Sequence, residues 1–309
     1  MKQTFEIPAQ EGGKKYYEDK GYPEVYVETK MTDQDRGCRS FKVDVISIER
    51  DTQREINDVL QAIGQRAEAT VYSHDRLTVK IGPFTKTNIR CLDITKHIII
   101  KNDTLVICGP TGYLPEVETI EIPNTVHRIE CWAMNDLPSL TTVTFNNNPT
   151  LTIQEGAFYG CSALKTISGL ANSNINGIEK CIFAGCENLE DVPIPHNYDV
   201  TSIPERYACG TAIKTLSIPD NIKCIEEDAF AYCSKLEAVY IMEGCERLER
   251  QAFSHCESLT IVKIPDSVKK IYENTFEGCG MFTVVCNPGS YAEYWANMMK
   301  IHVEHSGTL

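Results

Sequence analysis

The amino-acid sequence predicts a chain of the α+β class. We expect a small N-terminal α+β domain, then a right-handed solenoid of stacked coils with a parallel sheet, then a C-terminal cap of one helix and one strand. Two observations lead to this expectation. A unit of 23 residues recurs along the second half of the chain, and the first hundred residues lack that unit and differ from the rest in charge.

The repeat is clearest in three units aligned on Phe230, Phe253 and Phe276, which lie 23 residues apart. Each unit has a branched apolar residue five places before the Phe, then a Cys three places, an apolar residue six places and a Val nine places after it. These companions are Ile225, Leu248 and Ile271; Cys233, Cys256 and Cys279; Leu236, Leu259 and Phe282; and Val239, Val262 and Val285. A unit this short cannot bury itself as a helix pair and is stable only when stacked on its neighbours.

Four weaker copies precede these three, which makes about seven repeats. The one around Tyr207 has lost a residue before its aromatic and has Gly210 where the Cys belongs. The copies are Ile203 with Tyr207, Ile178 with Phe183 and Cys186, Ile153 with Phe158 and Cys161, and Ile129 with Met134 and Leu140.

Related phrases connect the units, at 122–129, 218–225 and 264–271, and each begins with Ile-Pro and then Asn or Asp. Pro ends a strand because it has no N–H, and Asp or Asn favours a turn. We therefore expect short parallel strands joined by turns, with the aromatic residues stacked inside. The strands include those around Val143, Val192, Leu216, Val239 and Val262, and the stacked residues are Phe158, Phe183, Phe230, Phe253 and Phe276.

The Ala-Phe pairs followed by Cys, at 157–161, 229–233 and 252–256, resemble BspA-type leucine-rich repeats. The resemblance covers about residues 115–286, and residues 287–303 look like the short helix and strand that commonly end such arrays. It implies a leucine-rich-repeat solenoid that is extended, non-catalytic and used for binding proteins, often in adhesion at microbial cell surfaces.

Four segments follow from these patterns: a small α+β domain at 1–88, an adaptor or cap of the solenoid at 89–118, the solenoid at 119–286 and a C-terminal cap at 287–309. Within the first segment we expect a strand at Phe41–Ile48, a helix that begins at Asp51 and a strand pair at Ala69–Ile81. The adaptor has strand-like runs on either side of Asn102-Asp103 and resembles a diverged first coil. Tyr291, Tyr294, Trp295 and Met298 have helical spacing, which fits a cap and alternatively a sticky patch for a partner.

The net charge of −13 comes from the repeats: residues 1–110 contain 17 basic and 17 acidic residues, whereas residues 111–309 contain 13 and 26. Nucleic acid is therefore not an expected partner, because phosphate binding needs clustered cations. No apolar run reaches the length of about 18 residues that a membrane span needs. The N-terminus has no apolar core like that of a secretion signal, which predicts a cytoplasmic protein; the family resemblance implies the alternative, a secreted or cell-surface one.

Fourteen cysteines raise the questions of zinc and disulfides, and their spacing favours neither. The sequence has no C-x-x-C pair, and His255 beside Cys256 occupies a repeat position that holds Tyr or Gly elsewhere. The five Cys at one repeat position (161, 186, 233, 256 and 279) predict a reduced ladder of small buried side chains. No metal and no cofactor is expected.

The residues give no convincing catalytic site, and we expect a protein that is not an enzyme. His74-Asp75 falls in a turn, Cys38 has no His near it in sequence, and Gly109–Gly112 lacks the Lys of a phosphate-binding loop. The alternative is an enzyme or regulator whose activity lies in residues 1–110 and whose repeats recruit the substrate.

The function that the pattern favours is the binding of a protein or peptide on the outward, concave face of the sheet, with the oligomeric state left open. Residues eight and ten places after each aromatic flank the buried Val, and alternation along a strand points them outward. The predicted contact residues are Ala238, Tyr240, Ile261 and Lys263, with Thr215 and Ser217 beside them, and the same rule places Thr142, Thr144, Thr166, Ser168, Asp191 and Pro193 on this face. The alternative is that these Thr and Ser are simply good strand formers and that Tyr240 packs across to Ile261.

Overall fold

The computed structural model describes residues 95–110, 114–170 and 173–306 in full, together with the backbone of five strands before them. These are β1 (Tyr26–Met31), β2 (Phe41–Ile46), β3 (Glu68–Tyr72), β4 (Thr78–Ile81) and β5 (Lys86–Asn88). The strand expected at 41–48 is β2, and the pair expected at 69–81 is the antiparallel pair β3 and β4. The helix expected from Asp51 lies outside the described residues.

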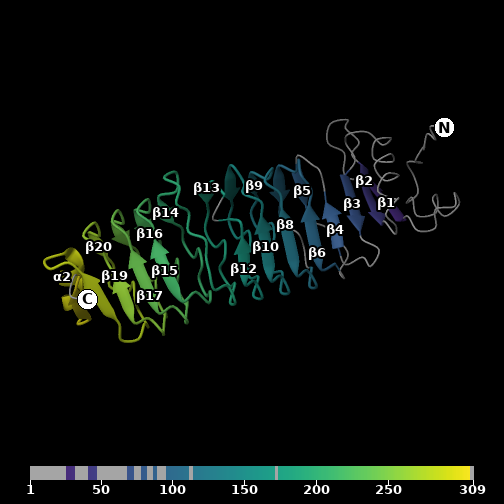
Figure 1. Cartoon of the computed structure of the whole chain (residues 1–309). Helices are drawn as coiled ribbons and strands as arrows, with labels where there is room; N and C mark the ends of the chain where they lie inside the picture. Colours follow the sequence, from purple (N-terminus) through teal and green to yellow (C-terminus); the bar gives the residue numbers. More distant parts are fainter. Residues whose placement is uncertain are drawn as a thin grey trace, which may run out of the picture.

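Every described coil except the one that begins at Phe183 adds one strand to each of two sheet faces, and the coils lie side by side along one axis (Figure 1). The Val sheet is named after the anchor Val of the repeat, a position that Ile or Leu fills in some coils. It contains β6 (His97–Ile100), β8 (Thr119–Ile122), β10 (Thr142–Phe145), β12 (Thr166–Ser168), β15 (Thr215–Ile218), β17 (Ala238–Ile241), β19 (Ile261–Lys263) and β21 (Thr283–Cys286). The Ile sheet contains β7 (Val106–Cys108), β9 (Arg128–Ile129), β11 (Leu151–Ile153), β13 (Ile175–Ile178), β14 (Ser202–Ile203), β16 (Cys224–Ile225), β18 (Arg247–Leu248) and β20 (Lys270–Ile271).

Neighbouring coils pair in parallel in both sheets, as the tandem repeat predicts. The expected strands around Val143, Leu216, Val239 and Val262 are confirmed as β10, β15, β17 and β19. Right-handed winding stays a prediction.

The Ile-Pro phrases end the Val-sheet strands, as expected. Pro123 and Pro219 come directly after β8 and β15. Each prolyl carbonyl then accepts a bond from the N–H three residues on, and Val126, Ile222 and Val268 donate at 3.2, 3.2 and 3.3 Å. The sequence of the connector thus closes the same turn in three coils.

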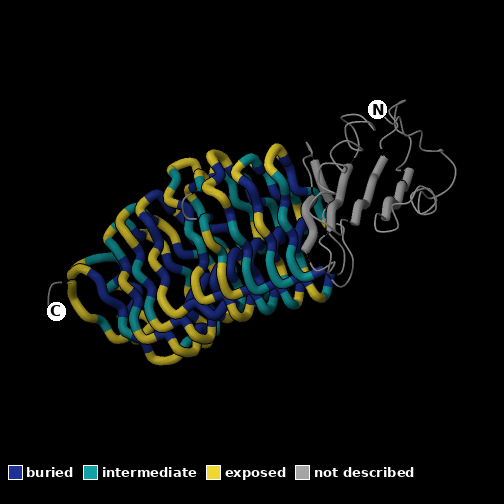
Figure 2. The backbone as a smooth tube through the Cα atoms, turned by 45° about the vertical axis from the view of Figure 1, so that its right-hand side comes forward, coloured by how far each residue is buried: buried dark blue, intermediate teal, exposed yellow. Residues whose placement is uncertain are grey.

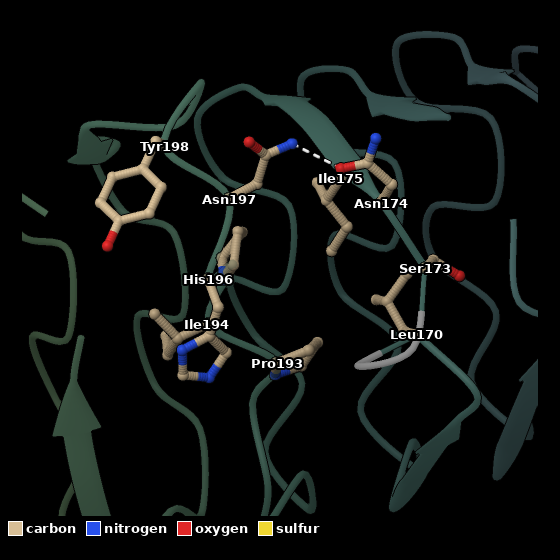
Figure 3. Close-up of a pocket in the computed structure, with 10 residues that line it drawn as sticks. Leu170, Ser173, Asn174, Ile175, Pro193, Ile194, His196, Asn197 and Tyr198 are labelled. Carbon is tan, nitrogen blue, oxygen red and sulfur yellow. Dashed lines mark hydrogen bonds between the residues drawn. The ribbon is translucent and has the colours of Figure 1, made fainter. Parts of the chain in front are cut away.

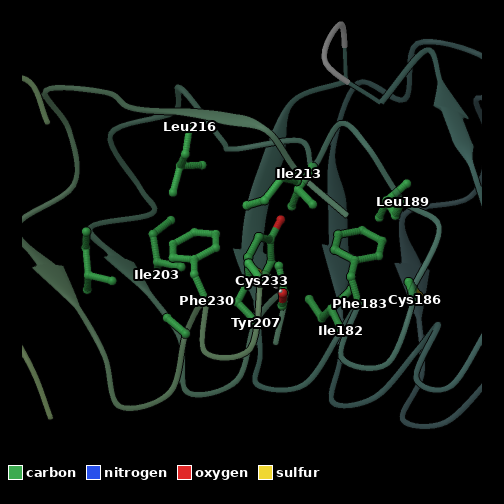
Figure 4. Packing of buried hydrophobic residues seen from close by; sticks show 14 of the residues in the cluster. Ile182, Phe183, Cys186, Leu189, Ile203, Tyr207, Ile213, Leu216, Phe230 and Cys233 are labelled. Atoms are coloured by element: carbon green, nitrogen blue, oxygen red, sulfur yellow. Dashed lines mark hydrogen bonds between the residues drawn. The ribbon is translucent and has the colours of Figure 1, made fainter. Parts of the chain in front are cut away.

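The predicted aromatic residues are buried. Buried positions recur from coil to coil along the described array (Figure 2), and Phe183 and Phe230 lie among the packed side chains inside it (Figure 4). The rings of Phe230 and Phe253 are 5.6 Å apart and nearly parallel, and those of Phe253 and Phe276 are 5.3 Å apart. Stacking at this separation lets each coil bury the ring of the next, which explains why a single coil is not stable alone.

The cysteines of the repeat form hydrogen bonds in addition to filling the core. In each of the five coils the thiol lies against the backbone carbonyl of the aromatic position, or the residue next to it, in the preceding coil. The Sγ to O distances are 3.1 Å for Cys161 and Met134, 3.2 Å for Cys186 and Phe158, 3.3 Å for Cys233 and Ala208, 3.4 Å for Cys256 and Phe230, and 3.0 Å for Cys279 and Phe253. The S–H donates to a carbonyl of the preceding coil, so these cysteines are polar links between coils as well as apolar filling.

The array extends beyond the seven predicted repeats. β6 pairs with β8 in the Val sheet and β7 pairs with β9 in the Ile sheet, so residues 97–108 form a coil rather than a hairpin around Asn102-Asp103. One step further, β4 pairs with β6 and β5 with β7. The N-terminal strands therefore continue the sheets of the solenoid, and a separate domain at 1–88 stays a prediction.

The strand expected around Val192 is absent: residues 190–197 belong to no strand, and the sheets divide into two stacks at this point. Pro193 and Pro195 explain the division, because neither can donate to a strand ladder. We call this place the junction. It also has longer connectors, since 20 residues separate Phe158 from Ile178 and Phe183 from Ile203, against 18 from Phe253 to Ile271.

The shortened unit around Tyr207 forms hydrogen bonds with the irregular segment of the junction. Tyr207 takes the place of a Phe in the aromatic stack, and its hydroxyl donates to the carbonyl of Pro193 at 2.6 Å. The next coil adds Asn221, whose buried side-chain amide faces the carbonyls of Pro195, Asn197 and Val200 at 3.1, 3.1 and 2.8 Å. The irregular segment is thus held by polar bonds where it lacks a strand ladder.

The last coil is covered by α2 (Tyr291–Met298) and β22 (His302–His305), the helix and strand expected at the C-terminal end. Trp295 is buried with its ring 5.6 Å from that of Phe276, and β22 pairs in parallel with β21. In this coil Val284, not the predicted Val285, pairs with Val262, because the turn before β21 is one residue shorter. The opposite side of α2 leaves Tyr294 and Met298 exposed.

Candidate protein-binding face

The outward side chains of the Val sheet form two rows that run across the coils. One row joins Thr215, Ala238, Ile261 and Thr283, and the other joins Ser217, Tyr240, Lys263 and Val285. We call the solvent side of the Val sheet, with these rows, the Val face. The predicted contact residues all lie on it, because residues on either side of a buried Val point the opposite way.

Exposure differs along these rows. Thr215, Ser217 and Lys263 are exposed, whereas Ala238, Tyr240 and Ile261 are half-buried. The sequence interpretation had Tyr240 and Ile261 exposed side by side. They are instead diagonal neighbours in different rows, since Ile261 pairs with Ala238 and Tyr240 pairs with Lys263.

Towards the N-terminus the Val face is lined by hydroxyl groups. Thr142 and Thr144 are half-buried on β10, and Thr166 and Ser168 are exposed on β12. The hydroxyls of Ser168 and Thr144 are hydrogen-bonded at 3.2 Å. Neighbouring coils are therefore tied by side-chain bonds on this face as well as by the strand ladder.

The Val face is interrupted at the junction. Asp191 and Pro193 were expected to continue the rows, and they lie on no strand. Pro193 interrupts the strand ladder because it has no N–H to donate, so the face consists of two parts separated by the junction. The C-terminal part contains the six predicted contact residues.

Charged side chains gather instead along the Ile sheet and its following turns, where they pair with each other. Four cations lie beside a carboxylate: Arg128 and Glu130 at 3.7 Å, Lys180 and Glu155 at 3.7 Å, Arg206 and Asp228 at 3.3 Å, and Arg247 and Glu249 at 3.5 Å. Exposed pairs of this kind contribute little to stability. They nevertheless use these four cations within the chain.

The described residues hold no group of three or more His, Cys, Asp or Glu arranged to bind a metal ion. His255 stacks on Tyr232 at a ring separation of 4.9 Å. Its repeat position requires a positive φ, which is 56° for His255 and 61° for Tyr232 and explains the Gly found there in other coils. The sequence showed which residues occur at this position and did not show that the backbone there needs a positive φ.

The described cysteines are free thiols, and most of the ladder is inaccessible. Burial raises the pKa of Cys233 to about 11 and that of Cys161 to about 12. A thiol is reactive as the thiolate, so these side chains are inert at neutral pH. Cys131, in contrast, is exposed. Cys38 and His74-Asp75, the candidates for a reactive thiol and a catalytic pair, lie outside the described residues.

A pocket of about 380 Å³ opens at the junction, between Leu170 with residues 173–175 on one side and residues 193–198 on the other (Figure 3). It was not foreseen from the sequence, although Pro193, Pro195 and the longer connectors were visible signals. Over the part of the chain that is described, no helix has the length and apolar character needed to cross a membrane.

Comparison with known proteins gives one match that extends over most of the array. A family model described as a BspA type leucine rich repeat region matches in six copies, over residues 112–237 and 168–283, which together exceed half of the chain. No curated protein matches.

Solved structures with a similar fold come from bacteria. A leucine rich cell surface protein from Faecalibacterium prausnitzii is 20% identical with a TM-score of 0.37, over 77% of this chain and 93% of that one. The leucine rich repeat protein of T. pallidum is 16% identical with a TM-score of 0.43, over 76% and 94% of the two chains. The pneumococcal vaccine antigen PcpA is 14% identical with a TM-score of 0.36, over 85% and 80%.

Proposed function

Because the chain belongs to the family of BspA-type leucine-rich repeat proteins, we propose that it is a non-catalytic interaction protein that binds a protein or peptide on the C-terminal part of the Val face. The family also favours the microbial cell surface, and adhesion there, over the cytoplasm as the setting of this binding.

The observation that supports this proposal most directly is the layout of the two outward rows. In the described coils the inward positions are filled by the aromatic, cysteine and aliphatic ladders. The outward positions form an ordered surface of hydroxyl, alkyl, phenol and ammonium groups at strand spacing. Such a surface can recognise a partner without any chemical step.

Tyr240 and Ile261 are the proposed centre of the contact. Large side chains that are already partly held lose little conformational freedom on binding, and burying their remaining surface gives much of the binding energy in protein interfaces. Lys263, exposed beside Tyr240, adds a positive group to which an acidic partner residue can pair.

The test uses the full chain as bait in the organism of origin, followed by affinity measurement with the purified partner. Tyr240→Ala with Ile261→Ala is expected to weaken binding by more than about 2 kcal/mol. Thr215→Arg with Ser217→Arg places bulk at two exposed positions, removes no buried contact, and is expected to block binding as well.

Arg247→Ala with Lys270→Ala on the Ile sheet is the matched control and should bind like the unchanged protein. Thermal unfolding of all three double variants shows whether the fold is retained. A partner that binds both Val-face variants at full affinity would refute this site and direct the search to the turns or to residues 1–110.

A further inference from the structure

The junction pocket is a consequence of two irregular coils that lie next to each other. The connectors after Phe158 and Phe183 are each two residues longer than those after Phe230 and Phe253. Described residues of these two connectors line a volume of about 380 Å³, within the range of roughly 300–1,000 Å³ typical of small-molecule sites.

The lining of the pocket has no charged side chain, although 24% of the residues of the chain are charged. Half of the lining is apolar and half consists of neutral hydrogen-bonding groups. The apolar residues are Leu170, Ile175, Pro193, Ile194 and Pro195, and the polar ones are Ser173, Asn174, His196, Asn197 and Tyr198. A charged ligand would find no counter-charge here, so the lining fits a neutral ligand.

Two of the polar groups are held in place by the fold. Asn197 donates from Nδ2 to Oδ1 of Asn174 at 2.5 Å and accepts from the Asp199 N–H at 3.0 Å (Figure 3). The backbone of Asn174 is bonded to Asn148 and Leu151 of the preceding coil. The Nδ2 group of Asn174 has no partner among the described residues and can donate to a ligand.

Tyr198 is the most exposed aromatic side chain of the pocket, with 74% of its surface accessible. It comes from the same bulge as His196 and Asn197, and its ring is presented at the rim (Figure 3). An exposed ring offers an apolar face for stacking and a hydroxyl for hydrogen bonding.

The backbone around the pocket argues against an extended peptide as the ligand. Pro193 and Pro195 have no N–H, and the carbonyl of Pro193 already accepts from Tyr207. The carbonyls of Pro195 and Asn197 already face the amide of Asn221. A peptide that adds as a strand needs free backbone donors and acceptors, and this segment has few to offer. Recognition must therefore use side chains.

A ring face for stacking, neutral donors and acceptors beside it and the absence of charge together match a sugar, which has an apolar C–H face and a ring of hydroxyl groups. We propose that the junction pocket binds a neutral sugar unit of a glycan, with Tyr198 stacked on the ring and Asn174 and His196 hydrogen-bonded to its hydroxyls. This site is separate from the Val face and does not depend on the function proposed for that face.

Saturation-transfer NMR on the full chain tests this proposal with methyl glycosides of glucose, galactose, mannose and N-acetylglucosamine as probes. At least one of the four should receive saturation, most strongly on the C–H protons of one ring face. Glucuronate and a blocked tri-alanine peptide serve as the charged and the peptide probes, and both should give no signal above background.

Tyr198→Ala should weaken the binding of that sugar by about tenfold or more, equivalent to about 1.4 kcal/mol. Tyr198→Phe keeps the ring and should stay within about threefold. Tyr294→Ala removes an equally exposed Tyr from α2 and should leave binding unchanged. The proposal is overturned if none of the four glycosides binds, if Tyr198→Ala binds as the unchanged protein does, or if glucuronate or the peptide binds as tightly as the best sugar.

Discussion

The regular coils after Tyr207 and the junction before it use the same inward residues and differ in how the coils are joined. In the regular stack, strand ladders in both sheets connect every coil, and the turns follow the Ile-Pro phrase. At the junction, Tyr207 and Asn221 replace those ladders with side-chain bonds to carbonyls. The comparison shows that the ladders of core residues determine the stacking, whereas the connectors determine whether a sheet continues.

Alkaline pH is expected to destabilise the stack through its buried thiols. The Cys233 thiol has a pKa of about 9 when unfolded and about 11 when folded. Above pH 9 the unfolded chain therefore loses a proton that the folded chain keeps. The stability that Cys233 contributes is complete below pH 9 and falls by about 1.4 kcal/mol per pH unit as the pH rises to 11.

Urea unfolding at a series of pH values from 7.5 to 10.5 measures this slope. Cys233→Ala should make it shallower by about one proton, and Cys131→Ala, which removes an exposed thiol, should not change it. An equal slope of the free energy of unfolding against pH in both variants would contradict the raised pKa of Cys233.

The next prediction concerns the loss of side-chain volume from the core of the regular stack, away from the junction. Phe253→Ala removes a ring that is stacked on both sides and should lower the free energy of unfolding by about 3–5 kcal/mol, as truncation of a core aromatic does. Chemical unfolding measures the loss. A loss below about half a kcal/mol would show that the ring is not part of the core.

Asn221→Ala tests the polar link between the junction and the first regular coil. The substitution leaves the buried carbonyls near Asn221 without a donor, and we expect a loss of about 1–3 kcal/mol. Ser267 is the matched residue in the regular stack, where its hydroxyl accepts a single bond from the Gly244 N–H. Ser267→Ala should cost less, and equal losses for the two variants would remove the distinction between the regions.

The smallest effect is expected for Tyr207→Phe. The ring stays in the aromatic stack, and only the bond from the hydroxyl to the Pro193 carbonyl is lost. The expected cost is about 1 kcal/mol. Hydrogen exchange should in addition become faster at residues near Pro193 and stay unchanged around Phe253, whereas a uniform change would contradict a local role.

The sequence predicts the structure at the positions that recur in every unit and is less informative where the repeat is interrupted. Phe158, Phe230 and Phe253 are buried as expected because each occupies a position at which only a large apolar side chain fills the coil. The strand at Val192 was wrong because the Val spacing was given more weight than Pro193, which removes a ladder donor. The coil of β6 and β7 was expected as a diverged first coil, whereas the continuation of the sheets to β4 and β5 was not expected.

The candidate site shows the same division. Alternation along a strand placed Thr215, Ser217 and Lys263 correctly on the exposed side. The half-buried state of Tyr240 and Ile261 depends on which residues pair across coils, and sequence spacing did not separate the two rows. The pocket depends on how two long connectors pack together, which is a property of their three-dimensional arrangement.

The way the junction is bonded has a mechanical consequence. No strand of the Val or Ile sheet pairs across it within the described residues, whereas backbone bonds such as that from the Phe183 N–H to the Tyr207 carbonyl still cross it on the aromatic side. The two stacks are therefore connected by backbone hydrogen bonds on the aromatic side, which forms a hinge between them. Bending that opens the strand side breaks no strand ladder, whereas bending that stretches the aromatic side breaks backbone bonds as well. A load on the C-terminal stack should accordingly tilt it as a unit about this hinge before any coil within it unravels.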